Sequence, residues 1–414
     1  MKKIILSSCL IIVCLFFIGT GIIYANMYTW SVSQQTSSNI EENTVVSAEI
    51  SEGDETGNNL NLQSGSAILI EQKSGQILYG YNVHEQLRPA SVTKIMSILL
   101  VMEQIELGKL DYETKVSCSK NAAGMGGSQI WLDTSETLSV HEMLKAICVV
   151  SANDCVMAMA EHIAGTEEGF VKLMNTKAQE LGMKDTKFKN CHGIDEDGHI
   201  TSAYDIALMS RELLNKYPEI TKYTTIYMDS LRDGKSSLVN TNKLIRTYNG
   251  CTGLKTGSTS QALYNLSVSA TRDDLSLIAV IMKGPTSNIR FDEAKKLLDY
   301  GFNNFEYRKL SVQGEKVKEI YIEKGITKTA EIIFKNDAGA LIPKGQSASI
   351  SQTISLADSL VAPIEEGETI GKVTYNIGEK KLLEVELIAK HEVKKIDIIT
   401  MTCKIYEKWF NLLR

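Results

Sequence analysis

Ser91 and Lys94 are the pair whose residue types and spacing most directly indicate chemistry in this sequence. They lie in the stretch 89–94, and the apolar run 95–102 that follows predicts a buried helix. Residues three apart share a helix face, so the amine would point at the hydroxyl. A serine needs an adjacent base to become a nucleophile. A lysine whose pKa is lowered by burial and by a neighbouring cation can be that base.

A serine and a lysine at this spacing occur by chance on many soluble helices, so the pair alone is weak evidence. Two further motifs strengthen the interpretation. Ser151-Ala152-Asn153 follows 60 residues after Ser91, and Lys255-Thr256-Gly257 follows about a hundred residues later. The three motifs in this order resemble the set shared by penicillin-binding proteins and class A β-lactamases. Together they predict a serine acyl-transfer site, with the start of the first helix offering N–H groups to a developing oxyanion.

Length and composition narrow the class of protein. A chain of 414 residues is long enough for two domains. With 23% charged residues and a net charge of −6, it lacks the basic character of a nucleic-acid-binding protein. No glycine-rich phosphate loop precedes a helix, so no nucleotide cofactor is expected. Five cysteines lie in the body of the chain, an odd number without a Cys-x-x-Cys pair, and we expect small buried residues rather than a disulfide framework: Cys118, Cys148, Cys155, Cys191 and Cys251.

The N-terminal segment predicts export. Lys2 and Lys3 precede an almost wholly apolar run over 4–24, and Ile23-Tyr24-Ala25 is an imperfect cleavage site. Residues 1–25 are therefore interpreted as a signal peptide, with an uncleaved N-terminal anchor as the alternative because the run is long enough to span a bilayer. Residues 26–63 are polar and predict a flexible tether. We expect the protein at the outer face of the cytoplasmic membrane or in the cell wall.

The elements that must position the motifs follow from hydrophobic periodicity and capping patterns. Ser139 and Glu142 form a capping-box pattern before the apolar run 143–150, which delivers Ser151 at its end. Further helices are expected over 154–164, 167–181, 202–215 and 291–302, and strands over 67–70, 77–81, 262–271 and 275–283. Ser202 and Asp205 are interpreted as a second capping pair. The expected fold of 64–305 is α/β (α+β), a sheet flanked by helices with a helical insert.

The C-terminal part has a different residue pattern from the catalytic part. Short β-like runs such as 317–322 and 369–375 are separated by Gly, Pro and Asn, so residues 306–393 predict a small all-β domain. Residues 394–414 predict an amphipathic helix suited to a membrane surface, because apolar residues recur at helical spacing between lysines. These apolar residues are Ile396, Ile399, Cys403, Tyr406 and Phe410. A terminal helix packed on its own domain is the alternative.

The motif set is similar to that of the serine D-alanyl-D-alanine carboxypeptidases, the low-molecular-mass penicillin-binding proteins of the peptidase S11 type. The resemblance covers about 64–305 and extends beyond the three motifs. It includes Ile130-Trp131-Leu132, the segments 193–199 and 202–205, Ser258-Thr259-Ser260 after the third motif, and Arg290 ahead of 293–298. The order of signal, catalytic domain, β-domain and amphipathic tail also resembles this family. A β-lactamase/transpeptidase-like fold is implied.

The resemblance implies a role for each residue of the site. Ser91 would attack the D-Ala-D-Ala peptide bond and form an acyl-enzyme, with Lys94 as general base and Ser151 relaying a proton to the leaving amine. Substrate binding would fall to Asn153, Lys255, Thr256, Gly257, Ser258 and Arg290, with the N–H groups of Ser91 and Ser258 as the oxyanion hole. The implied partners are the peptidoglycan stem peptide and β-lactam antibiotics as covalent inhibitors. No metal or other cofactor is implied, and no nucleic acid.

Three alternatives stay open on the sequence. A class A β-lactamase needs a glutamate to activate the deacylating water, and Glu180 and Glu212 are poorly placed for it. A D,D-endopeptidase would use the same chemistry on cross-links. A catalytically silent wall-binding or penicillin-sensing protein would not need the intact motifs. Ser258 stands where many relatives carry histidine, which bears on substrate fit rather than on the class of reaction.

Overall fold

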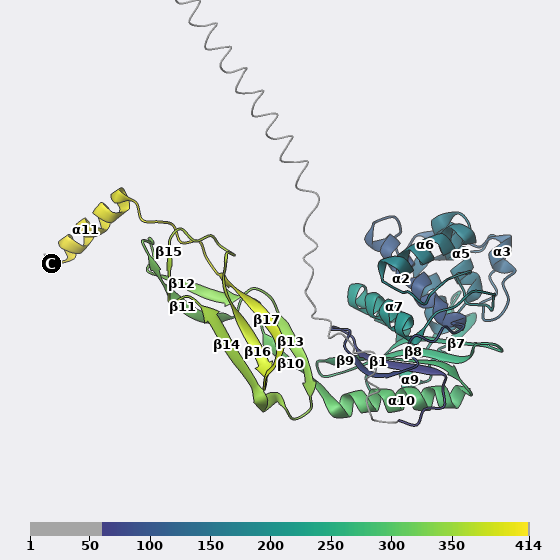
Figure 1. Ribbon diagram of the computed structural model, residues 1–414. Coiled ribbons are helices and arrows are strands. Elements are labelled where there is room, and N and C mark those ends of the chain that lie inside the picture. The colour runs from purple at the N-terminus through teal and green to yellow at the C-terminus, as the bar shows by residue number, and fades with distance from the viewer. Residues whose placement is uncertain (1–59, 413–414) are drawn as a thin grey trace, which may run out of the picture. The chain divides into compact units, whose positions relative to one another are not determined.

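The computed structural model describes residues 60–412. The expected export segment over 1–25 and the tether up to residue 59 lie outside the described residues. The catalytic part is built on one antiparallel sheet of five strands (Figure 1). In spatial order these are β2 (Ile77–Tyr81), β1 (Ser66–Glu71), β9 (Leu275–Gly284), β8 (Leu263–Arg272) and β7 (Cys251–Thr259). Among the described helices, none has the length and apolar character needed to cross a bilayer.

The sheet is buried on both faces, and alternate residues of its central strands feed two separate cores. Ile68 and Val280 belong to the core under the helical insert, whereas Leu69 and Ile281 belong to the core under α10 (Ser287–Asn304). Successive side chains of a strand point to opposite faces, so one apolar strand serves both layers. Figure 1 shows α10 along one face of the sheet, and α2 (Lys94–Glu106) and α7 (Ala203–Lys216) on the other.

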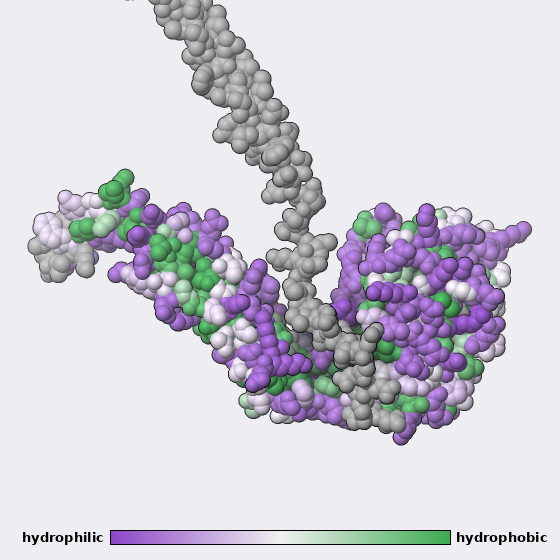
Figure 2. Space-filling view, viewed as in Figure 1, coloured by the Kyte–Doolittle hydropathy of each residue, from purple (hydrophilic) through white to green (hydrophobic). Residues whose placement is uncertain are grey.

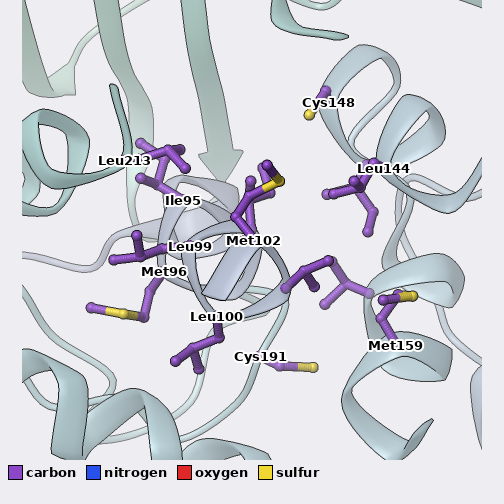
Figure 3. Close-up of a cluster of buried hydrophobic side chains, with 14 of the residues drawn as sticks. Ile95, Met96, Leu99, Leu100, Met102, Leu144, Cys148, Met159, Cys191 and Leu213 are labelled. Atoms are coloured by element: carbon purple, nitrogen blue, oxygen red, sulfur yellow. The ribbon is translucent and has the colours of Figure 1, made fainter. Parts of the chain in front are cut away.

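The helical insert surrounds α2 (Lys94–Glu106), whose residues 94–102 are all buried. A helix that is apolar on every side belongs at the centre of a domain. Side chains from α4 (Val140–Val149), α5 (Asn153–Ala164) and α7 enclose it, as Figure 3 shows for Leu144, Met159 and Leu213. The other helices of this part are η1 (Ala90–Thr93), α3 (Lys120–Ala123), α4 (Val140–Val149), α5 (Asn153–Ala164), α6 (Glu167–Glu180), α7 (Ala203–Lys216), η2 (Pro218–Ile220), α8 (Thr221–Thr224) and α9 (Leu244–Thr247).

Two short hairpins complete the insert. They pair β3 (Lys115–Ser117) with β4 (Thr137–Ser139), and β5 (Met228–Leu231) with β6 (Ser236–Val239). The described C-terminal part is an all-β domain with its own core, as expected, followed by α11 (Ile398–Leu412). Its strands are β10 (Phe305–Ser311) with β13 (Ala338–Pro343), and the six-stranded sheet β14 (Ile350–Leu356), β16 (Thr369–Ile377), β17 (Lys380–Ala389), β12 (Thr329–Phe334), β11 (Lys316–Glu323) and β15 (Ser359–Val361), with η3 (Ser347–Ser349) before β14.

The expected elements are confirmed with two corrections. The capping box of Ser139 and Glu142 is present in both directions. The second expected pair is only half formed, because the Ser202 hydroxyl accepts from the Asp205 N–H while the Asp205 carboxylate accepts from Asp185 and Thr186 instead. The last helix of the catalytic part begins at Ser287 rather than at 291, because the Thr286 hydroxyl caps it by accepting from the Ile289 N–H.

Candidate active site

Ser91 and Lys94 meet where a tight turn becomes the central helix. Ser91 lies in the 3₁₀ helix η1, and Lys94 is the first residue of α2. Side chains three apart eclipse each other in a 3₁₀ helix. The Lys94 Nζ accordingly lies 3.0 Å from the Ser91 Oγ, within hydrogen-bond distance. The expected contact of amine and hydroxyl is therefore present, on a 3₁₀ turn rather than on the first turn of an α-helix.

The Lys94 amine is completely buried among neutral oxygen atoms. Besides Ser91, its Nζ donates to the Asn153 Oδ1 at 2.6 Å and to the His192 carbonyl at 2.6 Å. Burial lowers the pKa of Lys94 well below its ordinary value, and the nearby Lys255 cation adds to the lowering. This environment favours the neutral amine, which is the form that accepts a proton from Ser91. The His192 carbonyl was missed from the sequence, since a main-chain acceptor has no residue-type signature.

Ser151 occupies a strained position between α4 and α5. Its φ angle of 65° lies in the left-handed region, which a residue other than glycine seldom adopts. Its hydroxyl is buried, and no hydrogen-bond partner for it is found within residues 60–412. Strain of this kind persists only where the surrounding structure enforces it, and it gathers at functional sites. Asn153, two residues later, opens α5 and joins this motif to Lys94.

Lys255 lies on β7 and is 1% exposed. Its Nζ donates to the Thr256 carbonyl at 2.9 Å. Burial lowers the pKa of Lys255 to about 7; the nearby Cys148 thiol acts in the opposite direction, and the Arg290 cation adds to the lowering. The charge of Lys255 bears on Lys94, so we infer that Lys94 loses its proton first and leaves Lys255 as the cation of the pair.

Gly257 lies where β7 packs closely against the start of η1. A Cβ at this position would lie 2.9 Å from the main-chain nitrogen atoms of both Ser91 and Val92. The absence of a side chain therefore lets the strand approach the nucleophile's own N–H group. This close approach is a reason for glycine that the sequence alone did not indicate. Ser258 follows and is exposed beside this junction.

Thr256 and Arg290 are both engaged within the protein. The Thr256 hydroxyl donates to the Thr241 Oγ1 at 2.7 Å. The Arg290 Nη1 donates to the carbonyls of Gly257 at 3.1 Å and Asn265 at 3.0 Å, and burial lowers the pKa of Arg290 to about 10. Arg290 thus links β7 to β8 through hydrogen bonds to one carbonyl on each strand. Its expected contact with a substrate carboxylate stays a prediction.

A loop over 126–132 packs against Asn153 and was not anticipated as part of the site. The Asn153 Nδ2 donates to the Gly126 carbonyl at 2.6 Å, and its N–H donates to the Ser128 carbonyl at 2.7 Å. The next residue, Asp154, is fully buried, and its carboxylate accepts from the N–H groups of Ile130 and Leu132 at 3.1 Å each. The position of Asp154, directly after the second motif, was the signal that sequence reasoning overlooked.

His199 contacts the 3₁₀ turn η1, which carries Ser91. Its Nε2 lies 2.8 Å from the Thr93 Oγ1, and its Nδ1 accepts from the Lys189 N–H at 2.9 Å. Burial lowers the pKa of His199 to about 4, so the ring is neutral at physiological pH. With Nδ1 accepting, the proton sits on Nε2 and the ring donates to Thr93. The histidine therefore fixes the turn that carries Ser91.

Comparison with known proteins now identifies the family. Residues 53–286, more than half of the chain, match the family described as D-alanyl-D-alanine carboxypeptidase. The chain belongs to this family. Residues 305–395 match the family described as penicillin-binding protein 5, C-terminal domain. The expected family, fold class and class of enzyme are thereby confirmed, and the carboxypeptidase is favoured over the β-lactamase alternative.

Individual relatives agree with this assignment. The carboxypeptidase is 42% identical to D-alanyl-D-alanine carboxypeptidase DacF of Bacillus subtilis, over 84% of its own length and 90% of the relative's. Its structure is similar to penicillin-binding protein 5 from Haemophilus influenzae, with a TM-score of 0.69, 32% identity, and coverage of 81% of this chain and 98% of the other. Penicillin-binding protein D2 from Listeria monocytogenes in the ampicillin-bound form gives a TM-score of 0.55 at 29% identity, covering 59% and 99%.

Proposed function

We propose that this enzyme removes the terminal D-alanine from peptidoglycan stem peptides through an acyl-enzyme on Ser91. The observation that carries the proposal is the Lys94 amine, fully buried and 3.0 Å from the Ser91 hydroxyl. A lysine in that environment is a base at physiological pH, and a serine beside it is a nucleophile. Membership of a D-alanyl-D-alanine carboxypeptidase family supplies the class of substrate.

Acylation begins with proton transfer. Lys94 takes the Ser91 proton while the Ser91 Oγ forms a bond to the carbonyl carbon of the scissile peptide, which gives a tetrahedral oxyanion. The N–H groups of Ser91 and Ser258 stabilise the oxyanion, and the close approach of β7 at Gly257 supports this pairing. The C–N bond then breaks, and the proton passes from Lys94 through the Ser151 hydroxyl to the leaving amine.

Recognition of the terminal carboxylate falls to β7. Lys255 provides the buried positive charge, and the Thr256 hydroxyl donates to the carboxylate once it turns away from Thr241, while Arg290 contributes charge from the far side of the strand. Asn153 holds the substrate amide on the acyl-donor side and keeps the Lys94 amine in place. Water hydrolyses the ester with Lys94 again as base, which regenerates Ser91. A β-lactam follows the same first step and leaves a penicilloyl ester on Ser91.

Intact-mass analysis of the purified protein tests this proposal. Incubation with benzylpenicillin should add one penicilloyl group on Ser91, and a peptide ending in Lys-D-Ala-D-Ala should release one D-alanine. Ser91→Ala should abolish both, and Ser97→Ala, at a buried serine on α2, the helix that follows η1, is the matched control. An adduct that vanishes within seconds without D-alanine release would indicate a β-lactamase. Full peptide cleavage by Ser91→Ala would refute the mechanism.

We also propose that the enzyme works outside the cytoplasm and that α11 associates with the membrane surface. Apolar side chains are exposed along this helix (Figure 2), among them Ile399 at 76% and Trp409 at 59%. An amphipathic helix of this kind lies in the headgroup region of a bilayer. The chain from residue 26 onward, without the expected export segment, should sediment with vesicles containing anionic lipid, and Ile399→Asp should weaken the binding. Equal sedimentation of both proteins would favour a helix that packs on its own domain.

A further inference from the structure

Trp131 combines two unfavourable features that the core does not explain. Its side chain is 75% exposed, although tryptophan is usually well buried. Its φ angle of 55° lies in the left-handed region, where a bulky residue is an outlier. An exposed indole on a strained backbone adds nothing to packing. Strained residues that persist in a fold gather at ligand contacts and active sites.

The backbone around Trp131 is fixed from two sides. The Asp154 carboxylate accepts from the N–H groups of Ile130 and Leu132, the residues before and after it. From the other side, the Arg232 Nη1 donates to the Ile130 carbonyl at 3.0 Å and its Nη2 to the Trp131 carbonyl at 3.4 Å. Arg232 is itself held by two contacts to the Glu136 carboxylate, at 2.6 and 3.0 Å. The indole is therefore presented by a rigid frame and not by a loose loop.

The same loop forms one edge of the active site. Its residues Gly126 and Ser128 accept hydrogen bonds from Asn153, the residue that anchors the Lys94 amine. With the Gln129 amide oriented to donate to the Met125 carbonyl at 2.8 Å, its oxygen accepts from the Trp131 Nε1 at 3.3 Å. The indole N–H is thus satisfied within the loop. The ring face remains for a ligand, and because this face carries partial negative charge, it attracts C–H groups, whose hydrogens are partially positive.

We propose that Trp131 is a specificity-determining contact for the part of the stem peptide that lies N-terminal to the scissile bond. This inference rests on the proposed function, in which Asn153 holds the substrate amide on that side. Residues further toward the substrate's N-terminus then extend past Asn153 along the 126–132 loop. The ligand surface is rich in C–H groups, either the aliphatic side chain of the residue before D-Ala-D-Ala or the face of the muramyl sugar.

Steady-state kinetics with substrates of increasing length test the contact. Trp131→Asn removes the ring but suits the left-handed backbone, so any loss of activity is not due to strain. We expect kcat/KM to fall about tenfold for a peptide ending in Lys-D-Ala-D-Ala and to be unchanged for acetyl-D-Ala-D-Ala. Trp131→Phe keeps a ring face and should recover most of the loss. If Trp131→Asn lowers kcat/KM for the muramyl pentapeptide but not for the peptide without the sugar, the sugar is the ligand. Equal kcat/KM for every substrate would overturn the inference.

Tryptophan fluorescence gives an independent measurement. The chain has three tryptophans, so Trp30→Phe and Trp409→Phe leave Trp131 as the sole emitter. In that background, Ser91→Ala prevents turnover, and the Lys-D-Ala-D-Ala peptide and the muramyl pentapeptide are titrated in turn. A saturable blue shift with either is expected, because the ligand removes water from the ring. No shift while calorimetry shows both bound would contradict the contact. Failure of the proposed function looks different: the wild type would then form no penicilloyl adduct on Ser91.

Discussion

The cations of the active site and those of the C-terminal β-domain lie in opposite environments. Lys94, Lys255 and Arg290 are at most 6% exposed, and their hydrogen bonds go to neutral oxygen atoms. In the β-domain, lysines lie at the surface opposite carboxylates, as in Lys372 with Glu384 at 3.0 Å. A cation removed from water without a counter-ion is destabilising, whereas an exposed ion pair contributes little either way. The buried, unpaired cations are kept because catalysis and substrate binding need them. The exposed ion pairs are typical of any protein surface.

This contrast indicates that the buried cations of the active site lower the stability of the fold and are kept for function. Burial lowers the pKa of Lys94 and Lys255, and that lowering is what supplies a base next to Ser91 and a charge that is ready to meet a carboxylate. On the β-domain, Lys372 and Lys381 lower the pKa of the exposed Glu384 to about 2 without creating a site. Burial is the main cause of the lowered pKa values at the active site, whereas exposed ion pairs cause that of Glu384. Substitutions at four residues test the difference, in order of expected effect.

Replacement of Lys94 should give the largest effect. Lys94→Arg keeps a cation but removes a group that can act as a base, since arginine does not lose its proton in proteins. We expect acylation by benzylpenicillin to slow by roughly 10³- to 10⁴-fold, measured by stopped-flow or timed mass analysis. Lys94→Met removes charge and base together and should be equally slow, which separates loss of the base from the larger size of arginine. Acylation within tenfold of wild type in either variant would exclude Lys94 as the base.

Asp154 is the buried anion that should matter most for stability. Asp154→Ala leaves the N–H groups of Ile130, Leu132 and Cys155 without their acceptor. We expect the free energy of unfolding to fall by roughly 3 kcal/mol, measured by urea denaturation. Asp154→Asn keeps one acceptor oxygen and should recover part of the loss. If Asp154→Ala is as stable as wild type, the 126–132 loop is held by other contacts.

Lys255 should reveal its lowered pKa through stability. Between about pH 7, its pKa in the folded state, and 10.5, its ordinary value, the unfolded chain binds more protons, so this lysine makes stability rise with pH. Relative to wild type, Lys255→Met should be most stable near pH 7, and the advantage should shrink by about 1.4 kcal/mol per pH unit above it. Lys372→Met is the control with an exposed lysine. A difference between Lys255→Met and wild type that does not vary with pH would mean an ordinary pKa.

The surface pair should give the smallest effect. Lys372→Met removes one partner of Glu384 on the β-domain sheet, where side chains are 50% and 31% exposed. We expect the free energy of unfolding to change by less than about 1 kcal/mol and to change less at high salt. Benzylpenicillin acylation should match wild type. A destabilisation as large as that of Asp154→Ala would remove the contrast between the two domains.

The sequence was informative where chemistry needs a particular side chain. Ser91 and Lys94 were predicted from their types and spacing, Ser151 and Lys255 from the resemblance of the motif set, and the central helix from its apolar run. The supporting contacts were not predictable in the same way, because the His192 carbonyl acts through the main chain and Arg232 comes from a distant hairpin. Gly257 was predicted as a site residue, but its close approach to the Ser91 N–H was not, since only the folded chain shows β7 against that group. Pairwise proximity of remote segments is what a single sequence lacks.

The most direct test is the pH dependence of the rate at which benzylpenicillin acylates Ser91. Since burial lowers the pKa of Lys94, its neutral form should already be present near neutral pH, and the rate should rise with pH along a limb far below 10.5. That limb should be absent in Lys94→Arg. As pH passes the Lys255 pKa of about 7, loss of its charge should lower carboxylate binding and bend the profile down. A rise only near the ordinary lysine pKa, or one that survives in Lys94→Arg, would contradict a buried lysine base.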